Sequence, residues 1–182
     1  MSVLPDIRPA GLADAEAIAA LHAAVWHETY RDLATPASIV ALTEAHRLKY
    51  WRAALAEDDP QALTLVTEID RTIVGFVRAA APQEPLFGER LEVKYLYVDR
   101  ARARRGIGRL LLRRIAQLLQ QRGHRALALG VVDGNTSAIK FYEALDGKVI
   151  GRYTDPGPLW RSDNLLYAWD DLAVLTDRRS SR

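Results

Sequence analysis

The 182-residue sequence contains no cysteine, which excludes disulfides, thiolate metal sites and any thioacyl-enzyme intermediate. Its four histidines are scattered, and none forms the i, i+4 pair that is typical of a helical zinc site. No apolar run reaches the roughly 18 residues of a membrane span, and the N-terminus lacks the pattern of an export signal. We therefore expect a cytoplasmic protein that needs neither a metal nor a membrane.

The composition is that of one folded domain. Hydrophobic residues make up 49% of the chain and charged residues 26%, which is enough for one substantial core. Repeats, low-complexity segments and linkers are not apparent. We expect a single domain over residues 1–175, followed by a flexible polar tail at 176–182.

Acidic residues are missing from one long segment. The formal net charge is only +2, but no Asp or Glu lies between Arg100 and Val132. Seven arginines fall between Arg100 and Arg114. This local positive charge indicates an anionic ligand at one place on the molecule.

Hydrophobic periodicity predicts alternating helices and strands. Strands are expected over 6–10, 62–69, 72–81, 90–100, 126–132, 148–154 and 164–172, and helices over 12–30, 39–59, 106–122 and 136–145. The runs 62–69 and 72–81 flank a short Asp-Arg turn, which predicts a hairpin. The fold class is therefore α/β (α+β), with a central mixed, mostly antiparallel sheet of about seven strands and about four helices on both faces.

The stretch "RRGIGR" at 104–109 lies between a predicted strand and a predicted helix. Free amides at a helix N-terminus bind anions, and glycine lets phosphate oxygens approach the backbone. The third glycine of a dinucleotide fingerprint is replaced by Leu111, and the Gly-Lys-Ser/Thr of a Walker loop is missing. A metal-free pyrophosphate site, as coenzyme A requires, and a plain turn with solvated arginines both remain open. Nucleic acid is not expected, because interleaved aromatic residues and a helix-turn-helix pattern are lacking.

Two motifs resemble one enzyme family. The segment "YLYVDRARARRGIGRLLL" is similar to the acyl-coenzyme-A-binding signature of the GNAT superfamily of acyl-CoA-dependent N-acyltransferases, and "NTSAIKFYEAL" resembles that superfamily's later helix. With the opening "IRPAGLADAEAIAALH", the similarity runs from about Ile7 to about Trp169. The chain departs from the family pattern at Ala103, where Arg or Gln is usual, and at Asp146-Gly147, where Gly-Phe is usual.

The resemblance implies a GNAT-like fold with splayed central strands and acetyl-CoA as the co-substrate. It implies that the strand "YLYV" pairs with the pantetheine arm and that the arginine- and glycine-rich turn holds the pyrophosphate. The coenzyme-binding residues implied in this way are Leu96, Tyr97, Val98, Arg104, Arg105, Gly106, Ile107, Gly108, Arg109, Asn135, Ala138, Phe141 and Tyr142.

The same resemblance makes Tyr142 the candidate general acid. Transfer of an acyl group from a thioester needs a proton for the departing thiolate, and a phenol with a reference pKa near 10 can supply it. Helical periodicity alone would also be satisfied by a core tyrosine at this position. Without cysteine, direct transfer in a ternary complex is the expected route, with a backbone N–H near Tyr97 stabilising the oxyanion.

An amine acceptor must also lose a proton, and Glu92 is the candidate base. Strand alternation predicts that Glu92, Lys94, Leu96 and Val98 share one face, which would place the carboxylate at the mouth of the cleft. His27 and a chain of water molecules remain alternatives for this role. A solvated strand end is the competing interpretation of Glu92.

Large aromatic residues are the candidates for the acceptor pocket. Trp26, Tyr30 and Trp160, together with Glu92, are the expected substrate-binding residues, and His27 and Trp51 belong to the same aromatic group. Core or dimer contacts would explain these residues equally well, so a monomer and a homodimer both remain open. The expected activity is N-acetylation of a primary amine of a small molecule or peptide. The alternative is a non-catalytic acyl-CoA-binding or sensing module of the same fold.

Overall fold

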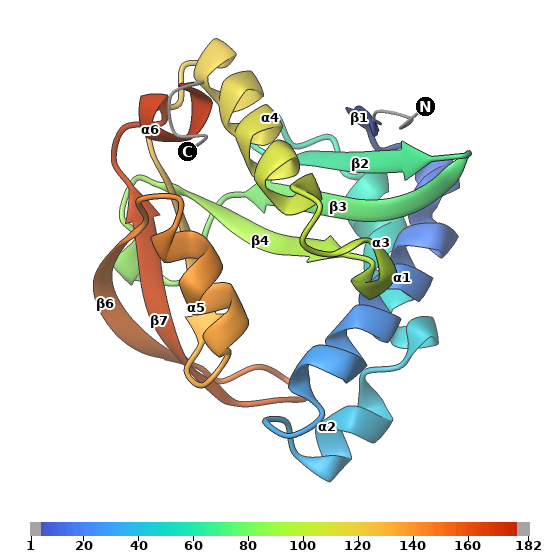
Figure 1. The fold of residues 1–182 in the computed structure, drawn as a ribbon. Coiled ribbons are helices and arrows are strands. Elements are labelled where there is room, and N and C mark those ends of the chain that lie inside the picture. The colour runs from blue at the N-terminus through green and yellow to red at the C-terminus, as the bar shows by residue number, and fades with distance from the viewer. Residues whose placement is uncertain (1–4, 178–182) are drawn as a thin grey trace.

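The computed structural model describes residues 5–177 and contains a seven-stranded sheet with helices on both faces (Figure 1). The strand order is β1-β2-β3-β4-β5-β7-β6, and only β4 and β5 run parallel. The strands are β1 Asp6–Pro9, β2 Leu63–Ile69, β3 Thr72–Ala80, β4 Leu91–Val98, β5 Leu127–Val132, β6 Lys148–Asp155 and β7 Ser162–Trp169. The predicted mostly antiparallel sheet is confirmed.

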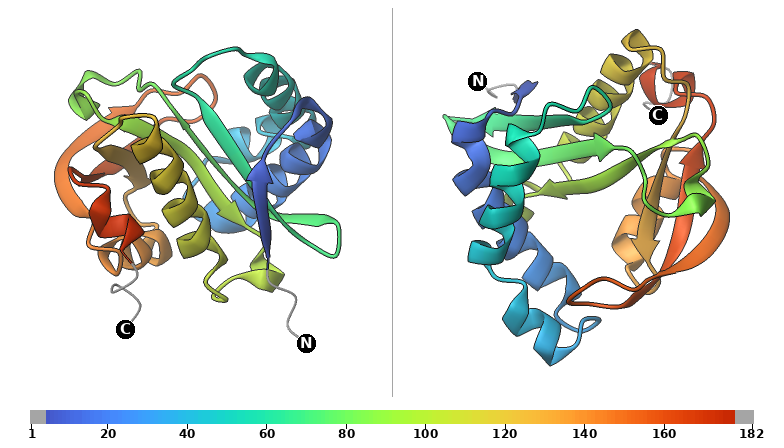
Figure 2. Two further views of the ribbon diagram at one scale, coloured as in Figure 1. Left: turned by 90° about the horizontal axis from the view of Figure 1, so that it is seen from above. Right: turned by 180° about the vertical axis from the view of Figure 1, so that it is seen from behind.

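The helices form two layers, which Figures 1 and 2 show from three directions. One layer contains α1 and α3, which pack on β2, β3 and β4, and the other contains α4 and α5. The helices are α1 Ala15–Tyr30, α2 Pro36–Ala41, α3 Glu44–Ala56, α4 Ile107–Gln121, α5 Thr136–Glu143 and α6 Ala173–Thr176. None of these described helices combines the length and apolarity that a membrane crossing demands.

The helix predicted over 39–59 is wrong in its first part. The chain there forms two helices, because α2 ends at Ala41 and α3 begins at Glu44. The hydroxyl of Thr43 accepts a hydrogen bond from the His46 amide at 3.2 Å and caps α3. A threonine cap thus interrupts an apolar period that appears continuous in the sequence.

The short helix α6 was not predicted from the sequence. It ends at Thr176, where the flexible tail was expected to begin. Residues 178–182 of that predicted tail lie outside the described residues.

Two turns follow from local backbone chemistry, and the first confirms the predicted hairpin. Asp70 and Arg71 join β2 to β3 with φ values of 50° and 63°, as a two-residue hairpin turn requires. Asp146 follows α5 with φ 59°, so it adopts the left-handed conformation in place of the family's usual glycine. A Cβ on Gly147 would lie 2.8 Å from the Trp169 ring, so tryptophan fills the space beside this turn.

The strands β4 and β5 part almost as soon as they meet. Their parallel pairing comprises Leu91 with Leu127 and Glu92 with Ala128. Beyond this point β4 stays paired with β3, while β5 stays paired with β7 (Figure 1). The sheet therefore opens into a wedge, with the rest of β4 on one side and the rest of β5 on the other.

A β-bulge in β4 corrects the predicted strand alternation. Arg78 of β3 pairs with Tyr95, but the next residue, Ala79, pairs with Val93, so Lys94 is the extra residue. A bulge reverses the facing of all later side chains. Leu96 and Val98 consequently pack with the α4 core, whereas Tyr95 and Tyr97 pack with the α1–α3 core. The prediction that Glu92, Lys94, Leu96 and Val98 share one face is wrong.

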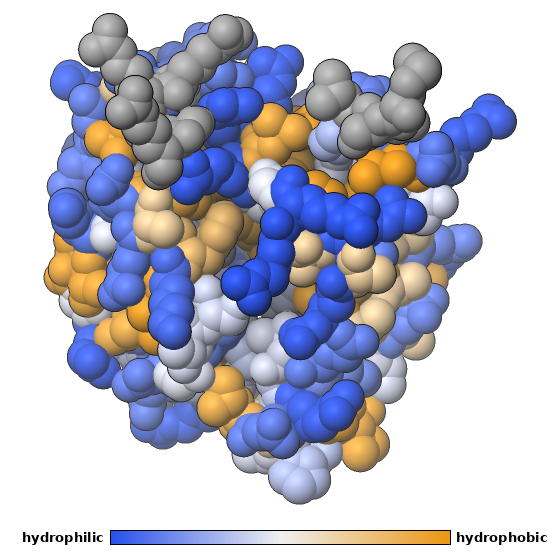
Figure 3. Space-filling model, viewed as in Figure 1, coloured by the Kyte–Doolittle hydropathy of each residue, from blue (hydrophilic) through white to orange (hydrophobic). Residues whose placement is uncertain are grey.

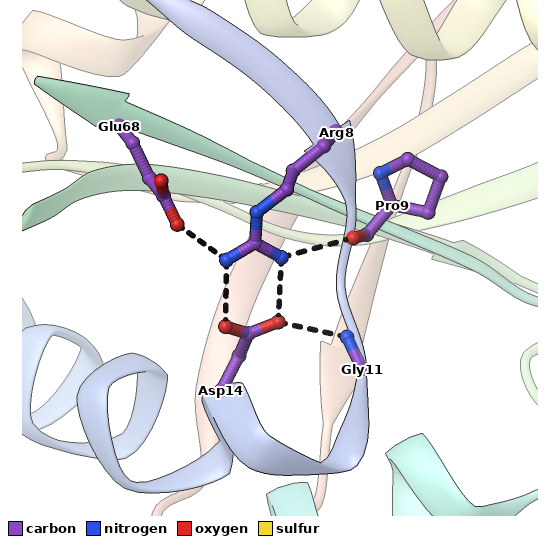
Figure 4. A network of polar contacts seen from close by, with 5 residues as sticks. All are labelled: Arg8, Pro9, Gly11, Asp14 and Glu68. Atoms are coloured by element: carbon purple, nitrogen blue, oxygen red, sulfur yellow. Dashed lines mark hydrogen bonds and ion pairs between the residues drawn. The ribbon is translucent and has the colours of Figure 1, made fainter. Parts of the chain in front are cut away.

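An arginine in β1 ties the N-terminal elements together (Figure 4). Both terminal nitrogens of Arg8 donate to the Asp14 carboxylate at 2.8 Å, and the same guanidinium contacts Glu68 of β2. The Gly11 amide also donates to Asp14 at 2.8 Å. The hydrogen bonds from Arg8 hold the pKa of the Asp14 carboxyl below its usual range. This network fixes the start of α1 against the sheet.

We expect Asp14→Asn to lower the free energy of unfolding by about 1 kcal/mol at pH 7. Because the Asp14 pKa is depressed in the folded state, its contribution is complete above the ordinary aspartate pKa of about 4 and is lost as the pH falls through the folded value. The free energies of unfolding of wild type and Asp14→Asn, measured by urea titration, should therefore converge as the pH falls below about 4. Asp6→Asn, at an exposed position, serves as the control. A difference in the free energy of unfolding that stays constant as the pH falls would contradict this role of Asp14.

Candidate functional site

The wedge between β4 and β5 contains a small cavity that we call the gap cavity. Its volume is about 190 Å³, and its walls include Leu96 and Tyr97 of β4, Gly130 of β5, Tyr30 of α1 and Tyr142 of α5. Alternate β4 residues direct their N–H and C=O groups toward this wedge. These groups lack a strand partner there, because β5 no longer pairs with β4. The gap cavity thus combines unpaired strand backbone with tyrosine side chains.

A larger cavity of about 790 Å³ adjoins the gap cavity on the face that carries α4 and α5. We call it the α4–α5 cavity. Leu96, Val98 and Tyr142 line both cavities. Its other walls are the turn before α4, the first turn of α4 and α5, lined by Ala103, Arg104, Gly106, Ile107, Gly108, Arg109, Thr136, Ser137, Ala138, Lys140 and Phe141.

The start of α4 gives this cavity the features of an anion site. The first helical hydrogen bond runs from the Leu110 amide to the Gly106 carbonyl, so the amides of Ile107 and Gly108 precede it and lack an acceptor within the helix. Gly106 has φ 80°, which a side chain would strain. A Cβ on Gly108 would lie 3.3 Å from the Phe141 ring, so glycine keeps the cavity open there.

Positive side chains surround this helix start. Arg100, Arg104 and Arg105 are exposed, while Arg109 is half-buried and lines the cavity. In Figure 3, strongly hydrophilic side chains gather over the segment that leads into α4. The helix dipole and these arginines therefore favour the same sign of ligand charge.

A third cavity lies on the opposite face of the sheet, beneath α1 and α3, and we call it the α1–α3 cavity. Its volume is about 350 Å³. Tyr30, Tyr97 and Gly130 line both this cavity and the gap cavity, so the wedge joins the two faces. Seven Trp and Tyr side chains contribute to its walls: Trp26, Tyr30, Tyr50, Tyr95, Tyr97, Tyr153 and Trp160.

Tyr142 lies at the junction of the gap cavity and the α4–α5 cavity. Its ring packs against Phe141, Tyr167 and Trp169, with centroids between 5.0 and 6.1 Å apart. Burial raises the pKa of the Tyr142 phenol well above its ordinary value. The hydroxyl therefore stays protonated at neutral pH, as a proton donor must.

Glu92 lies at the point where β4 and β5 part, and it lines the α1–α3 cavity. Burial raises the pKa of its carboxyl, and the ion pair with Lys94 opposes that shift. A carboxyl with a raised pKa is better matched to a general base at neutral pH than an exposed one.

The structure brings together most of the residues that the sequence suggested. Of those suggested for the coenzyme, Tyr97, Arg105 and Asn135 do not line the α4–α5 cavity, although Tyr97 and Asn135 line the gap cavity. Asn135 also caps α5 and donates to the Tyr30 hydroxyl at 3.4 Å. The four residues suggested for the acceptor, Trp26, Tyr30, Glu92 and Trp160, all line the α1–α3 cavity.

Two other residues suggested for the acceptor side lie elsewhere. A ring nitrogen of His27 bonds to the Leu42 carbonyl at 3.0 Å, and this side chain lines none of the three cavities. Trp51 is fully buried in the core between α1 and α3. His27 and Trp51 therefore contact other parts of the folded protein and do not line the acceptor cavity.

Among the residues of the α1–α3 cavity that sequence reasoning missed are His22 and Arg47. Both lie on the buried stripes of their helices, His22 four residues after Ile18 and Arg47 four residues before Trp51. A polar residue at a position that the helical period assigns to the core was the available signal.

The sequence model of the Acetyltransferase (GNAT) family matches residues 26–147. That match covers more than half of the chain. The chain belongs to the GNAT acetyltransferase family. Human N-acetyltransferase 8 is 30% identical over 88 residues, which are 48% of this chain and 39% of the human protein. This GNAT chain therefore spans well under two thirds of that relative.

Solved structures share the GNAT fold over most of both chains. The PaiA N-acetyltransferase of Thermoplasma acidophilum, in complex with coenzyme A, has a TM-score of 0.75 at 18% identity, covering 91% of this chain and 98% of its own. YncA of Salmonella typhimurium, solved with its cofactor acetyl-CoA, has a TM-score of 0.68 at 21% identity, covering 93% and 95%. At these identities the likeness shows the fold.

We expect Gly108→Val to narrow the α4–α5 cavity, because its side chain must displace the Phe141 ring. Affinity for acetyl-CoA should fall about tenfold, as measured by calorimetry. Gly11→Val is the control, because a Cβ at Gly11 meets nothing within 4 Å. Unchanged affinity in Gly108→Val would exclude this cavity as the coenzyme site.

Proposed function

We propose that this GNAT protein transfers the acetyl group of acetyl-CoA to a primary amine in a ternary complex. The observation that carries the proposal is the wedge between β4 and β5, which joins a cavity with an anion-binding helix start to an aromatic cavity on the other face. Two reactants can thus approach one point from opposite faces of the sheet. Family membership supports acetyl transfer as the reaction.

The coenzyme is proposed to occupy the α4–α5 cavity. Its pyrophosphate would bind the amides of Ile107 and Gly108 with help from Arg104 and Arg109. Its pantetheine arm would pair with β4 backbone near Leu96 and bring the thioester into the gap cavity. The described residues contain no group of three or more His, Cys, Asp or Glu that could hold a metal ion.

The acceptor amine is proposed to enter through the α1–α3 cavity. Glu92 takes one proton from the ammonium group, directly or through water, and the freed nitrogen lone pair attacks the thioester carbonyl carbon. The nitrogen of the tetrahedral intermediate then loses its second proton to water. A β4 backbone N–H near Tyr97 stabilises the oxyanion. When the C–S bond breaks, the thiolate takes the phenolic proton of Tyr142, which solvent later replaces.

We expect Tyr142→Phe to lower kcat about 100-fold, because the thiolate loses its proton donor. Acetyl-CoA affinity should remain, since the phenyl ring keeps its packing. Free-thiol release with a panel of amines measures turnover. Tyr167→Phe is the matched control, because the Tyr167 hydroxyl that it removes contacts Glu143. Equal turnover in wild type and Tyr142→Phe would remove Tyr142 from the mechanism.

We expect wild-type kcat/KM to rise with pH as Glu92 deprotonates, with a midpoint above the ordinary glutamate pKa of about 4.3. Glu92→Gln should lack this acidic limb and turn over slowly at every pH. The measurement is a pH–rate profile at saturating acetyl-CoA. An acidic limb that persists in Glu92→Gln would assign the base to another group.

A further inference from the structure

Arg47 is a buried cation that faces the α1–α3 cavity without an acidic partner. The residue is 8% exposed, and its Nε atom lacks a hydrogen-bond acceptor. Within residues 5–177 its side chain makes no ion pair or hydrogen bond, and its guanidinium carbon lies 5.6 Å from the centre of the Trp26 ring. Burial lowers the pKa of Arg47, which reflects a charge that is poorly compensated.

A second buried arginine shows what compensation looks like in the same fold. Arg78 is 4% exposed and donates to the Thr64 hydroxyl at 2.9 Å, to the Ala54 carbonyl at 3.3 Å and to the Glu57 carboxylate at 3.3 Å. The Arg78 Nε also lacks an acceptor, so the contrast with Arg47 lies in the terminal guanidinium nitrogens, which have partners only in Arg78. The contrast indicates that the partner of Arg47 comes from outside the described residues.

His22 adds a second unsatisfied donor to the same cavity. The indole N–H of Trp51 can only donate, and it lies 3.1 Å from His22 Nδ1, so the imidazole proton is on Nε2. His22 is fully buried and its Nε2 lacks an acceptor. Burial lowers the pKa of His22 to about 2, so the ring is neutral and Nε2 remains an N–H donor.

Donors without acceptors favour an anionic ligand, and a planar guanidinium suits a carboxylate. The acids of the same cavity do not fill this role, because Glu92 pairs with Lys94 and Asp155 accepts from the Gly157 amide. Asp155, which makes no ion pair within the described residues, instead gives the cavity a negative part that suits an ammonium group. The cavity therefore offers opposite charges to the two ends of one small molecule.

We propose that Arg47 and His22 bind the carboxylate of the acceptor, which is a free amino acid. This inference rests on the proposed function, because it assigns the acceptor class of that reaction. The volume of about 350 Å³ suits a small molecule, and the aromatic walls suit an apolar or aromatic side chain. A peptide N-terminus lacks the α-carboxylate, and a polyamine would place more positive charge beside Arg47.

The first test compares matched acceptors. Phenylalanine, leucine and methionine are assayed by thiol release against their amides, which mimic a peptide, and against the corresponding decarboxylated amines. In wild type we expect kcat/KM for the best amino acid to exceed that of its amide and amine about 10- to 100-fold. In Arg47→Gln this ratio should fall to near one, while Arg52→Gln, an exposed position on the same helix, should retain it.

Two results of that assay would overturn the inference. One is a wild-type enzyme that uses the amide or amine as well as the amino acid. The other is an Arg47→Gln variant that keeps the wild-type ratio.

The second test needs no turnover, so it separates this inference from the proposed reaction. Calorimetry on the coenzyme-A-loaded protein should detect N-acetylphenylalanine but not N-acetylphenylalaninamide, and Arg47→Gln should abolish the difference. If no amine releases thiol, the proposed reaction fails, and this binding difference alone decides the carboxylate site. Equal affinity for both compounds would refute it.

Thermal melting of the ligand-free protein checks for a purely structural role. Removing an uncompensated buried charge should raise the melting temperature of Arg47→Met, whereas Arg78→Met should melt lower because its partners lose their donor. A fall in Arg47→Met comparable to that in Arg78→Met would mean that Arg47 serves the fold, and would overturn the inference.

Discussion

The parting of β4 from β5 after two residue pairs is the constraint on which the site depends. If the parallel pairing continued, hydrogen bonds between the two strands would close the sheet and separate its faces. Because β5 turns away with β7, the backbone of β4 from Val93 onward borders a wedge. Each face of the sheet can then contribute one cavity to a common point.

The two faces have opposite chemical characters. The α4 side offers backbone amides, the helix dipole and arginines, which suit an anionic carrier such as a nucleotide diphosphate. The α1 side offers aromatic walls, carboxylates and two unsatisfied donors. Tyr142 and Glu92 lie where the wedge meets these different surroundings, and burial raises the pKa of both groups. The positions of Tyr142 and Glu92 and the raised pKa values of both groups thus follow from the same opening in the sheet.

Local patterns predicted much of this fold. The alternation of strands, the Asp-Arg hairpin and the glycine-opened start of α4 each depend on neighbouring residues, so they can be read from the sequence. Most of the residues suggested for the coenzyme line the α4–α5 cavity, because they are contiguous in two motifs. Their contribution to binding stays a prediction.

The rest depends on contacts between distant segments. The bulge at Lys94 arises from pairing with β3, and no local signal marks it, so the face of Glu92 relative to Leu96 was predicted wrongly. The break before α3 is decided by a threonine cap within an otherwise helical period. The proposed role of Arg47 depends on the packing of α3 over the sheet, which buries this arginine without an acidic partner among the described residues.

A crystal structure of the protein with acetyl-CoA tests the central claim most directly. We expect the diphosphate on the amides of Ile107 and Gly108, and the thioester carbonyl between β4 and β5 within reach of Tyr142. A coenzyme bound on another surface, or a wedge closed by paired strands, would contradict that claim.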